Sequence, residues 1–330
     1  MPRFLFRLFI FLVLLTVISA GISMYYNEFV MKYSILLRKE RQFEAFCDST
    51  KYLFLGDSHI MHGFNPDSIG GSFNLAMSSE NTMQTYFRLR YLLNESPCGK
   101  NIRCVFLPFE QHTFSSQRLN VYPETAWSIT WYYRQFVDSF EEDEYADNWF
   151  SLAKLHLQFY LWSYRNQGMV IAQSPANWFG KPDSLRPILK GYLPRCENFS
   201  ILPDSLQISY SKERSVYHFD PSKYNLHEPV LIEFFEKILK LCESKNIPVI
   251  LLSLPVTREY YECGKNEFGI GTEHHELDSV LARYSKIYRL DYTDMFFDRN
   301  EYFADPDHVN EAGANLLSKK IAEDIAVLGL

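Results

Sequence analysis

Short runs of apolar residues alternate along the chain with segments of helical spacing, and this alternation limits the fold more than any other feature. Continuous apolar runs of this length are typical of strands buried on both faces of a parallel sheet. We expect strands of this kind at residues 51–56 and 247–254, and further strands at residues 72–77, 102–109 and 287–292. Strands separated by helices predict an α/β architecture in which helices cover a parallel sheet.

The segments between these runs have apolar residues on one helical face. We expect helices at residues 81–93, 228–241, 274–286 and 310–327, and a more polar one at residues 32–48. The alternation stops at residues 112–224, which hold all five tryptophans and many tyrosines. We interpret this stretch as an aromatic-rich insertion over the strand ends. Its aromatic rings could stack on sugars, or could serve as core or interface anchors.

The N-terminus combines Arg3 and Arg7 with a charge-free run from Leu8 to Tyr26. About twenty apolar residues suffice to span a bilayer, and the positive flank predicts that the short N-terminus stays inside. A signal peptide cleaved near Ala20 is the alternative. We favour an uncleaved anchor, because the apolar run continues past Ala20. The expected location is the plasma (inner) membrane, with one span and the domain facing the periplasm or the cell exterior.

The predicted domain organisation follows from these patterns. Residues 1–27 form a transmembrane anchor, residues 28–50 a juxtamembrane segment, and residues 51–330 one α/β domain with the insertion at about 112–224. The net charge of −7 argues against broad binding of nucleic acid, which needs a surplus of Lys and Arg.

Six cysteines are compatible with disulfides in an outward-facing domain. Cys98 and Cys104 could pair across a short loop, and Cys242 and Cys263 could pair across a strand; the sequence does not decide between the possible pairings. No two cysteines have the CxxC spacing of a zinc ribbon or a thioredoxin-type site.

Two polar loops follow strands that we expect in the same sheet. Gly56-Asp57-Ser58-His59 comes directly after the first strand, and Asp305 and His308 follow the last one. Ligands of open parallel sheets bind outside the carboxyl ends of the strands, so both loops belong to one edge. There Asp305 could accept the Nδ1–H of His308 and leave Nε2 free to take a proton from Ser58.

Gly56-Asp57-Ser58 behind an apolar strand, together with Asp305-x-x-His308 near the C-terminus, resembles the SGNH (GDSL) hydrolase superfamily. The resemblance implies a flavodoxin-like three-layer α/β/α sandwich in which Ser58 is the nucleophile and Asp305 and His308 complete the triad. The single span and the pair Ser58-His59 also resemble membrane-anchored members that handle O-acyl groups on cell-surface glycans, as in alginate acetylation and teichoic-acid D-alanylation. The resemblance covers the two motif regions and the general layout, and not the aromatic insertion.

The chain departs from this pattern at the oxyanion hole, where the family has a glycine in its second block and an asparagine in its third. Ser78 or Ser79 stands near the position of the glycine, and Gln111 could replace the asparagine, although Glu110 would bring a carboxylate to a developing negative charge. The sequence therefore predicts either a reshaped oxyanion hole or a hydrolase activity that is weak or absent. The candidate oxyanion or substrate-binding residues are Asp57, His59, Asn74, Ser78 and Gln111.

Simpler roles exist for the same residues. Ser58 could be only a helix N-cap, and Asp305 or Asn310 could cap the last helix. His59 and His62 with Asp57 could hold a metal within one turn, but the sequence offers no obvious third ligand, so we expect no metal and no cofactor.

Two functions follow. The first is an anchored, outward-facing serine esterase or O-acyltransferase acting on acyl groups of cell-surface glycans, and the sequence does not separate these two outcomes. The alternative is a non-catalytic SGNH-like protein that binds glycan or is a scaffold partner of a membrane acyltransferase. The expected partners are an acylated carbohydrate and the membrane, with a membrane acyltransferase as a further candidate and no nucleic acid.

Overall fold

The computed structural model describes residues 2–25, 35–120, 188–271 and 275–329. A five-stranded parallel sheet has the order β2-β1-β3-β4-β5. Its strands are β1 (Tyr52–Phe54), β2 (Ser72–Asn74), β3 (Cys104–Pro108), β4 (Val249–Ser253) and β5 (Ile287–Asp291). This is the flavodoxin-like order, in which the chain reverses direction across the sheet between β1 and β3. The predicted α/β fold class is confirmed.

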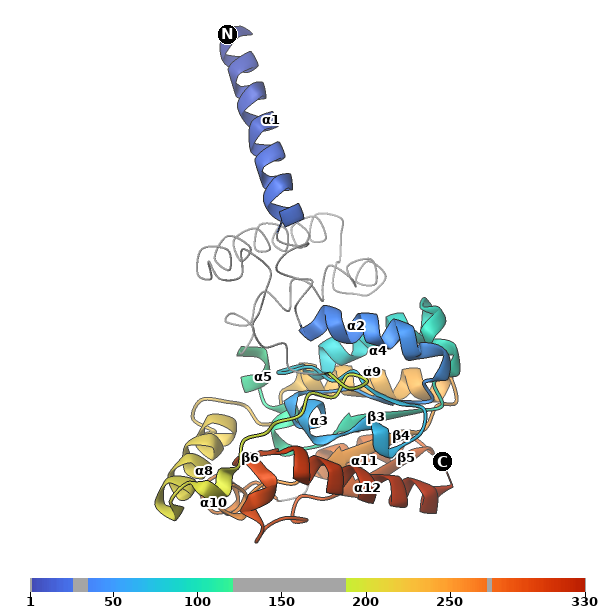
Figure 1. The fold of residues 1–330 in the computed structure, drawn as a ribbon, viewed down its shortest axis with the longest axis vertical. Helices are drawn as coiled ribbons and strands as arrows, with labels where there is room; N and C mark the ends of the chain where they lie inside the picture. Colours follow the sequence, from blue (N-terminus) through green and yellow to red (C-terminus); the bar gives the residue numbers. More distant parts are fainter. Residues whose placement is uncertain (1, 26–34, 121–187, 272–274, 330) are drawn as a thin grey trace. The chain divides into compact units, whose positions relative to one another are not determined.

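Helices cover both faces of this sheet (Figure 1). Their bounds are α2 (Ile35–Phe46), α3 (Ser58–Gly63), α4 (Thr82–Asn94), α5 (Gln117–Asn120), α8 (Asp204–Phe219), α9 (Pro229–Ser244), α10 (Arg258–Phe268), α11 (His275–Leu281) and α12 (Glu311–Leu328). A short antiparallel pair, β6 (Phe303–Asp305) and β7 (His308–Val309), precedes α12.

Alternate strand residues point to opposite faces, and each face has its own apolar core. Leu53, Val105 and Leu251 face a core that includes residues of α2, α4, α9 and α11. Phe54, Phe106 and Ile250 face the other core, with residues of α3 and α12. Figure 1 shows α2, α4 and α9 on one side of the sheet and α12 on the other. The protein is therefore a three-layer α/β/α sandwich.

The helix ends follow local sequence. Asn81 and Gln84 form a reciprocal capping box at the start of α4, and the side chain of Asn310 accepts the Gly313 N–H at the start of α12. One expected helix is shorter than its pattern: α11 ends at Leu281 and not at Lys286. The N–H of Tyr284 there bonds to the carbonyl of Leu281, a tight turn that leads the chain into β5.

The disulfide joins Cys47 to Cys98. The two pairings considered from the sequence, Cys98 with Cys104 and Cys242 with Cys263, are therefore wrong. Cys98 belongs to the core on one face of the sheet and Cys104, the first residue of β3, to the core on the other face, so the sheet separates them. Cys242 is fully buried on α9, whereas Cys263 is only partly buried on α10.

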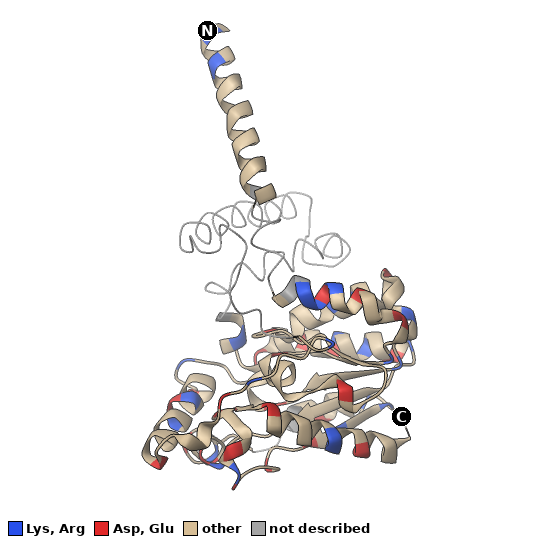
Figure 2. Ribbon diagram, in the orientation of Figure 1, with Lys and Arg blue, Asp and Glu red and all other residues tan. Residues whose placement is uncertain are grey.

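The segment expected to be juxtamembrane contributes to the core of the α/β unit. Phe43 and Cys47 are buried among the residues of α4 and α9, and Lys39 on α2 has no exposed surface. In α1 (Pro2–Tyr25), residues Pro2–Ile22 form a segment that is long and apolar enough to cross a membrane, as the helix of a signal sequence would also be. Figure 2 shows its basic residues at the N-terminal end only.

The aromatic insertion falls largely outside the described residues. All five tryptophans lie there, so the proposed stacking on sugars stays a prediction. The described end of the stretch contains α8, which packs against α10 beside a small apolar cluster that includes Phe219 and Tyr260. α8 also carries Arg214, which contacts Asp307 in the hairpin before α12.

Candidate active site

The chain makes an abrupt turn between β1 and α3. Gly56 has a φ of +126°, and a Cβ atom built on it would lie 2.5 Å from Cδ of Pro108 on the adjacent β3. A residue with a side chain would be both strained and obstructed there. The turn is completed by Asp57, whose carboxylate accepts the N–H of His59 and so forms the N-cap of α3. Ser58 is consequently the first helical residue and not the cap that we considered.

Ser58 and His308 come from opposite ends of the α/β pattern and meet at this edge. The Oγ atom of Ser58 lies 2.9 Å from Nε2 of His308. The Nδ1 atom of His308 lies 2.9 Å and 3.1 Å from the two carboxylate oxygens of Asp305. Ser58 is half-buried, whereas His308 is only 6% exposed. The three side chains therefore form one continuous series of hydrogen-bonding contacts.

Asp305 is held by its own hairpin and by a distant arginine. It pairs with His308 across β6 and β7, and its Oδ1 accepts the backbone N–H groups of Asp307 and His308 at 3.2 Å and 2.9 Å. Its other oxygen accepts the guanidinium of Arg195. These contacts explain why Asp305 faces the imidazole and does not cap α12, a role that Asn310 fills.

A second carboxylate lies behind the imidazole. Oδ1 of Asp307 is 3.3 Å from Nδ1 of His308, and both of its oxygens lie 2.9 Å from Nε of Arg214 on α8. Burial alone would lower the pKa of His308, but Asp307 and Asp305 outweigh it and raise that pKa above its usual value. The same imidazole, with His59 and Arg214, holds the pKa of Asp307 well below its usual range despite burial.

Asp57 is buried, and its carboxylate is occupied by contacts within the protein. Its carboxylate accepts the guanidinium of Arg118 and lies 3.1 Å from Nε2 of His112. Although burial raises the pKa of a carboxyl group, Arg118 and the two histidines His112 and His59 hold the pKa of Asp57 well below its usual range. Asp57 therefore positions the start of α3 and the neighbouring His112.

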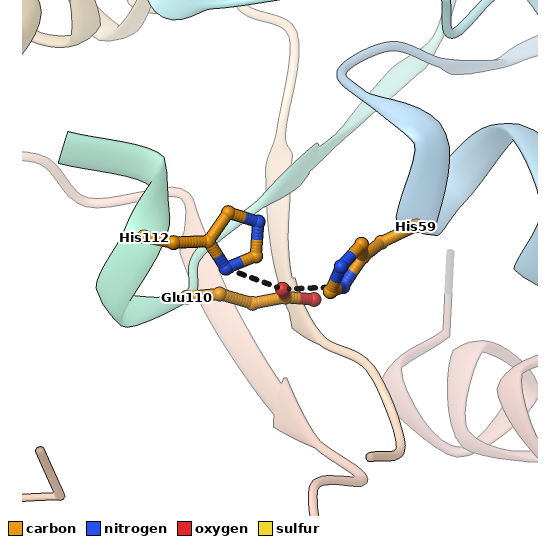
Figure 3. Close-up of side chains that lie close together, drawn as sticks. All are labelled: His59, Glu110 and His112. Atoms are coloured by element: carbon orange, nitrogen blue, oxygen red, sulfur yellow. Dashed lines mark ion pairs between the residues drawn. The ribbon is translucent and has the colours of Figure 1, made fainter. Parts of the chain in front are cut away.

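His59 and His112 lie on either side of Glu110, which comes shortly after the end of β3 at Pro108 (Figure 3). Oε2 of Glu110 is 2.7 Å from Nδ1 of His59 and 3.3 Å from Nδ1 of His112. We expected the carboxylate of Glu110 near a developing oxyanion; the structure turns it toward these two imidazoles. His59, Glu110 and His112 line a cavity of about 300 Å³, together with Gln111 and residues of the β4 and β5 ends.

The remaining candidate oxyanion residues have different surroundings. The amide of Asn74 donates to the carbonyls of Ile60 and Phe64 and its oxygen accepts the Ala76 N–H, so this side chain braces the loops around α3. Ser78 is exposed in the loop after β2, and Ser79 has a φ of +61°. Gln111 is half-buried at the cavity.

A buried polar cluster fixes the loop that contains Ser78. The amine of Lys39 donates to the carbonyl of Ala76, and the guanidinium of Arg88 donates to that of Leu75. Burial lowers the pKa of Lys39 well below its usual value, and burial raises the pKa of Glu80, which faces Arg88 at 3.4 Å, to about 7. This cluster was not predicted from the sequence, because Lys39 lies in a segment that looked solvated.

The metal site considered from the sequence is not assembled. Asp57 faces Arg118, and Nδ1 of His62 lies 2.8 Å from the carbonyl of Leu193, so neither joins His59 around a common point. Burial, followed by the charge of His308, lowers the pKa of His62 to about 3. Two other sets among the described residues have ligand atoms within 4.8 Å of one another: His59 with Glu110 and His112, and His59 with Asp307 and His308.

Sequence reasoning missed the three arginines, Arg118, Arg195 and Arg214, and the pairing of Glu110 with His112. The alternation Glu110-Gln111-His112 at a strand end could have indicated the second of these, since it places two polar side chains at the same edge as Ser58. The arginines come from segments without a recognisable pattern.

No family model matches the chain, and no curated protein matches it. A solved structure that resembles it is described as "The structure of a putative platelet activating factor from Streptococcus pneumonia". The two share 11% sequence identity with a TM-score of 0.34, over 93% of this chain and 99% of that one. A likeness of this size supports no inference about the site.

Proposed function

We propose that the protein is an SGNH-type serine esterase or O-acyltransferase that acts on acyl groups of cell-surface glycans. The observation that carries the proposal is the series of contacts from Ser58 through His308 to Asp305, with 2.9 Å at both steps. A serine hydroxyl is a weak nucleophile until an adjacent base takes its proton, and an imidazole held by a carboxylate is such a base.

In the proposed reaction, Ser58 Oγ attacks the carbonyl carbon of an ester while Nε2 of His308 takes the hydroxyl proton. Asp305 keeps the other ring proton on Nδ1 and stabilises the imidazolium that forms. When the tetrahedral intermediate collapses, the bond to the leaving alcohol breaks and His308 returns the proton to that oxygen. The acyl group on Ser58 then passes to water, which gives an esterase, or to a sugar hydroxyl, which gives a transferase.

The oxyanion donors in this proposal come from the loop after β2 and from the cavity edge. Ser78 and Ser79 offer backbone N–H groups and hydroxyls, and Gln111 offers an amide. Asn74 is not a candidate, because its amide hydrogens already donate to Ile60 and Phe64.

Two features support an outward-facing, anchored enzyme. α1 is long and apolar enough to span a membrane and is basic only near its start, which favours an inside N-terminus. The disulfide between Cys47 and Cys98 is of the kind that persists in oxidising compartments. The choice of an acylated glycan as substrate follows from the resemblance of the motif residues to membrane-anchored SGNH proteins.

The alternative is a non-catalytic SGNH-like domain that binds glycan or supports a membrane acyltransferase. It is favoured by the absence of the Gly-x-Asn element from the sequence after β3, where Glu110 faces two histidines. Without a complete oxyanion hole, the rate typically falls by about 10² to 10³.

Labelling with a fluorophosphonate probe separates the two proposals. We expect full-length protein in detergent to be labelled and to hydrolyse p-nitrophenyl acetate. The variant Ser58→Ala should show neither labelling nor hydrolysis. Ser244→Ala, at the exposed end of α9, is the matched control and should behave like the wild type. A folded wild-type protein with neither labelling nor turnover would favour the non-catalytic alternative.

A further inference from the structure

We propose that His59, Glu110 and His112 bind one divalent transition-metal ion, with Zn²⁺ the best fit, beside the serine site. The three side chains come from the segments that follow β1 and β3, where the strand order of the sheet reverses and where flavodoxin-like sheets bind their ligands. They converge on a single region in Figure 3. This proposal does not depend on the proposed esterase.

The separations of Glu110 from the two histidines are close to those of ligand atoms in a metal site, and all three ligand atoms lie within 4.8 Å of one another. Zn²⁺ bonds of about 2.0–2.1 Å in tetrahedral geometry place neighbouring ligand atoms about 3.3 Å apart. Oε2 of Glu110 lies 3.3 Å from Nδ1 of His112 and 2.7 Å from Nδ1 of His59. A shift of Glu110 Oε2 by about half an ångström away from His59 would bring its separation from Nδ1 of that residue close to the value for Zn²⁺.

Each histidine also has its second ring nitrogen on a separate carboxylate. Nε2 of His59 lies 3.1 Å from Asp307, and Nε2 of His112 lies 3.1 Å from Asp57. Metal-ligating histidines nearly always donate their other N–H to such an acceptor, which fixes the tautomer and increases the basicity of the ligating nitrogen. Here both donations leave Nδ1 as the electron-pair donor, and both Nδ1 atoms lie next to Glu110.

One of these nitrogen atoms has no directed hydrogen bond. Nδ1 of His59 is buried and forms none, although Oε2 of Glu110 is only 2.7 Å away. Since the residue is only 3% exposed, water has little access to this nitrogen. The two atoms are both electron-pair donors, and they lie close together without a hydrogen bond between them. This is the arrangement expected when both bind the same metal ion.

The charges around the cluster favour a cation. Arg118 pairs with Asp57 and Arg214 with Asp307, so each outer carboxylate has its own counter-charge. In the part of the chain that the structure describes, both ion pairs of Glu110 are with the two histidines. With neutral imidazoles this half-buried carboxylate has no compensating charge, and a bound metal would supply it.

The site is also accessible from the cavity of about 300 Å³, which all three side chains line. Three protein ligands with a fourth position open to a cavity are typical of catalytic rather than structural zinc. The cavity also contains Tyr260 and Arg289, which could contact a ligand bound at the open position.

The competing interpretation is that the cluster holds a proton on His59 in place of a metal. Titration calorimetry of metal-stripped full-length protein with Zn²⁺ distinguishes the two. We expect saturable binding at one ion per chain, and absorption of bound Co²⁺ in the visible region with the intensity of four-coordinate geometry. The absence of saturable binding to folded wild-type protein would overturn the proposal.

Variants locate the ion. His112→Ala and the nearly isosteric Glu110→Gln should each weaken Zn²⁺ binding more than about 100-fold, and Asp57→Asn should weaken it by about 10- to 100-fold through His112. His62→Ala, on the same helix as His59, and Cys196→Ser, which removes an exposed thiol, should bind as the wild type does. Unchanged binding by both His112→Ala and Glu110→Gln would place the ion elsewhere and overturn the assignment. A rise in the unfolding temperature on addition of Zn²⁺ that is lost in Glu110→Gln would support the assignment.

Discussion

The Nδ1 atom of His308 lies 2.9 Å from Oδ1 of Asp305, and the carboxylate of Asp305 is fixed in turn by two backbone N–H groups and by Arg195. Asp307 lies nearly as close, 3.3 Å from the same nitrogen, but both of its oxygens face Arg214. The geometry thus gives the two carboxylates different roles. Asp305 orients the imidazole, and Asp307 adds negative charge behind it.

Replacing each carboxylate tests this division. In the proposed enzyme, Asp305→Asn should reduce kcat by up to about 10⁴, because the amide can hold the imidazole in the wrong tautomer. Asp307→Asn should reduce kcat much less and should instead lower the free energy of unfolding, because it removes the buried partner of Arg214. Turnover of p-nitrophenyl acetate and urea unfolding measure the two effects. A larger loss of kcat in Asp307→Asn would reverse the assignment.

The pH dependence of kcat/KM tests the environment of His308. The imidazole must be neutral to accept a proton from Ser58, and neighbouring Asp307 and Asp305 raise its pKa despite burial. Activity should therefore increase with pH through a midpoint above the ordinary histidine value of about 6.5. Asp307→Asn removes a negative charge and should move this midpoint to lower pH. A wild-type midpoint at or below the ordinary value would contradict the electrostatic description.

Gly56→Ala tests the turn that presents Ser58. The new Cβ would lie 2.5 Å from Cδ of Pro108 at a φ of +126°, so strain and overpacking should together cost about 2 kcal/mol or more of stability. Gly70→Ala is the matched control, since its Cβ would meet nothing within 4 Å. Urea unfolding of both variants provides the comparison, and equal midpoints would show that the turn adapts to a side chain.

Glu80 predicts a specific dependence of stability on pH. Burial raises its pKa from 4.5 to about 7, so between these values the folded protein keeps a proton that the unfolded chain releases. The contribution of Glu80 to stability is therefore greatest below pH 4.5 and declines as the pH rises toward 7. Glu80→Gln should remove this decline. Unfolding free energies of both proteins at several pH values measure it, and parallel curves would show that Glu80 ionises normally.

The features predicted from sequence were those encoded locally. β1, β3 and β4 lie in short apolar runs that locate them in the sequence, and the alternation of strands with helices indicated a parallel sheet. Asp305 and His308 are three residues apart in one hairpin, and the carboxyl-edge rule for parallel sheets placed them with Ser58. Such reasoning needs only chain order and spacing.

The features that were not predicted depend on contacts between distant segments. The partner of Cys98 is Cys47, in a helix that looked solvated until its burial against α4 and α9 was known. The contacts of Glu110 with His59 and His112 were also not predicted, because the side chain of a residue just past a strand end is set by its neighbours and not by strand period. Arg195 and Arg214 had no local pattern that linked them to the last hairpin.

The bond between Cys47 and Cys98 has a practical consequence for anyone producing this domain. Because it fixes the end of α2 to the turn before β3, a chain made in a reducing bacterial cytosol would carry two extra thiols and lack this connection. Export to an oxidising compartment should give a more homogeneous product. Faster migration on a non-reducing gel would identify the disulfide-bonded protein.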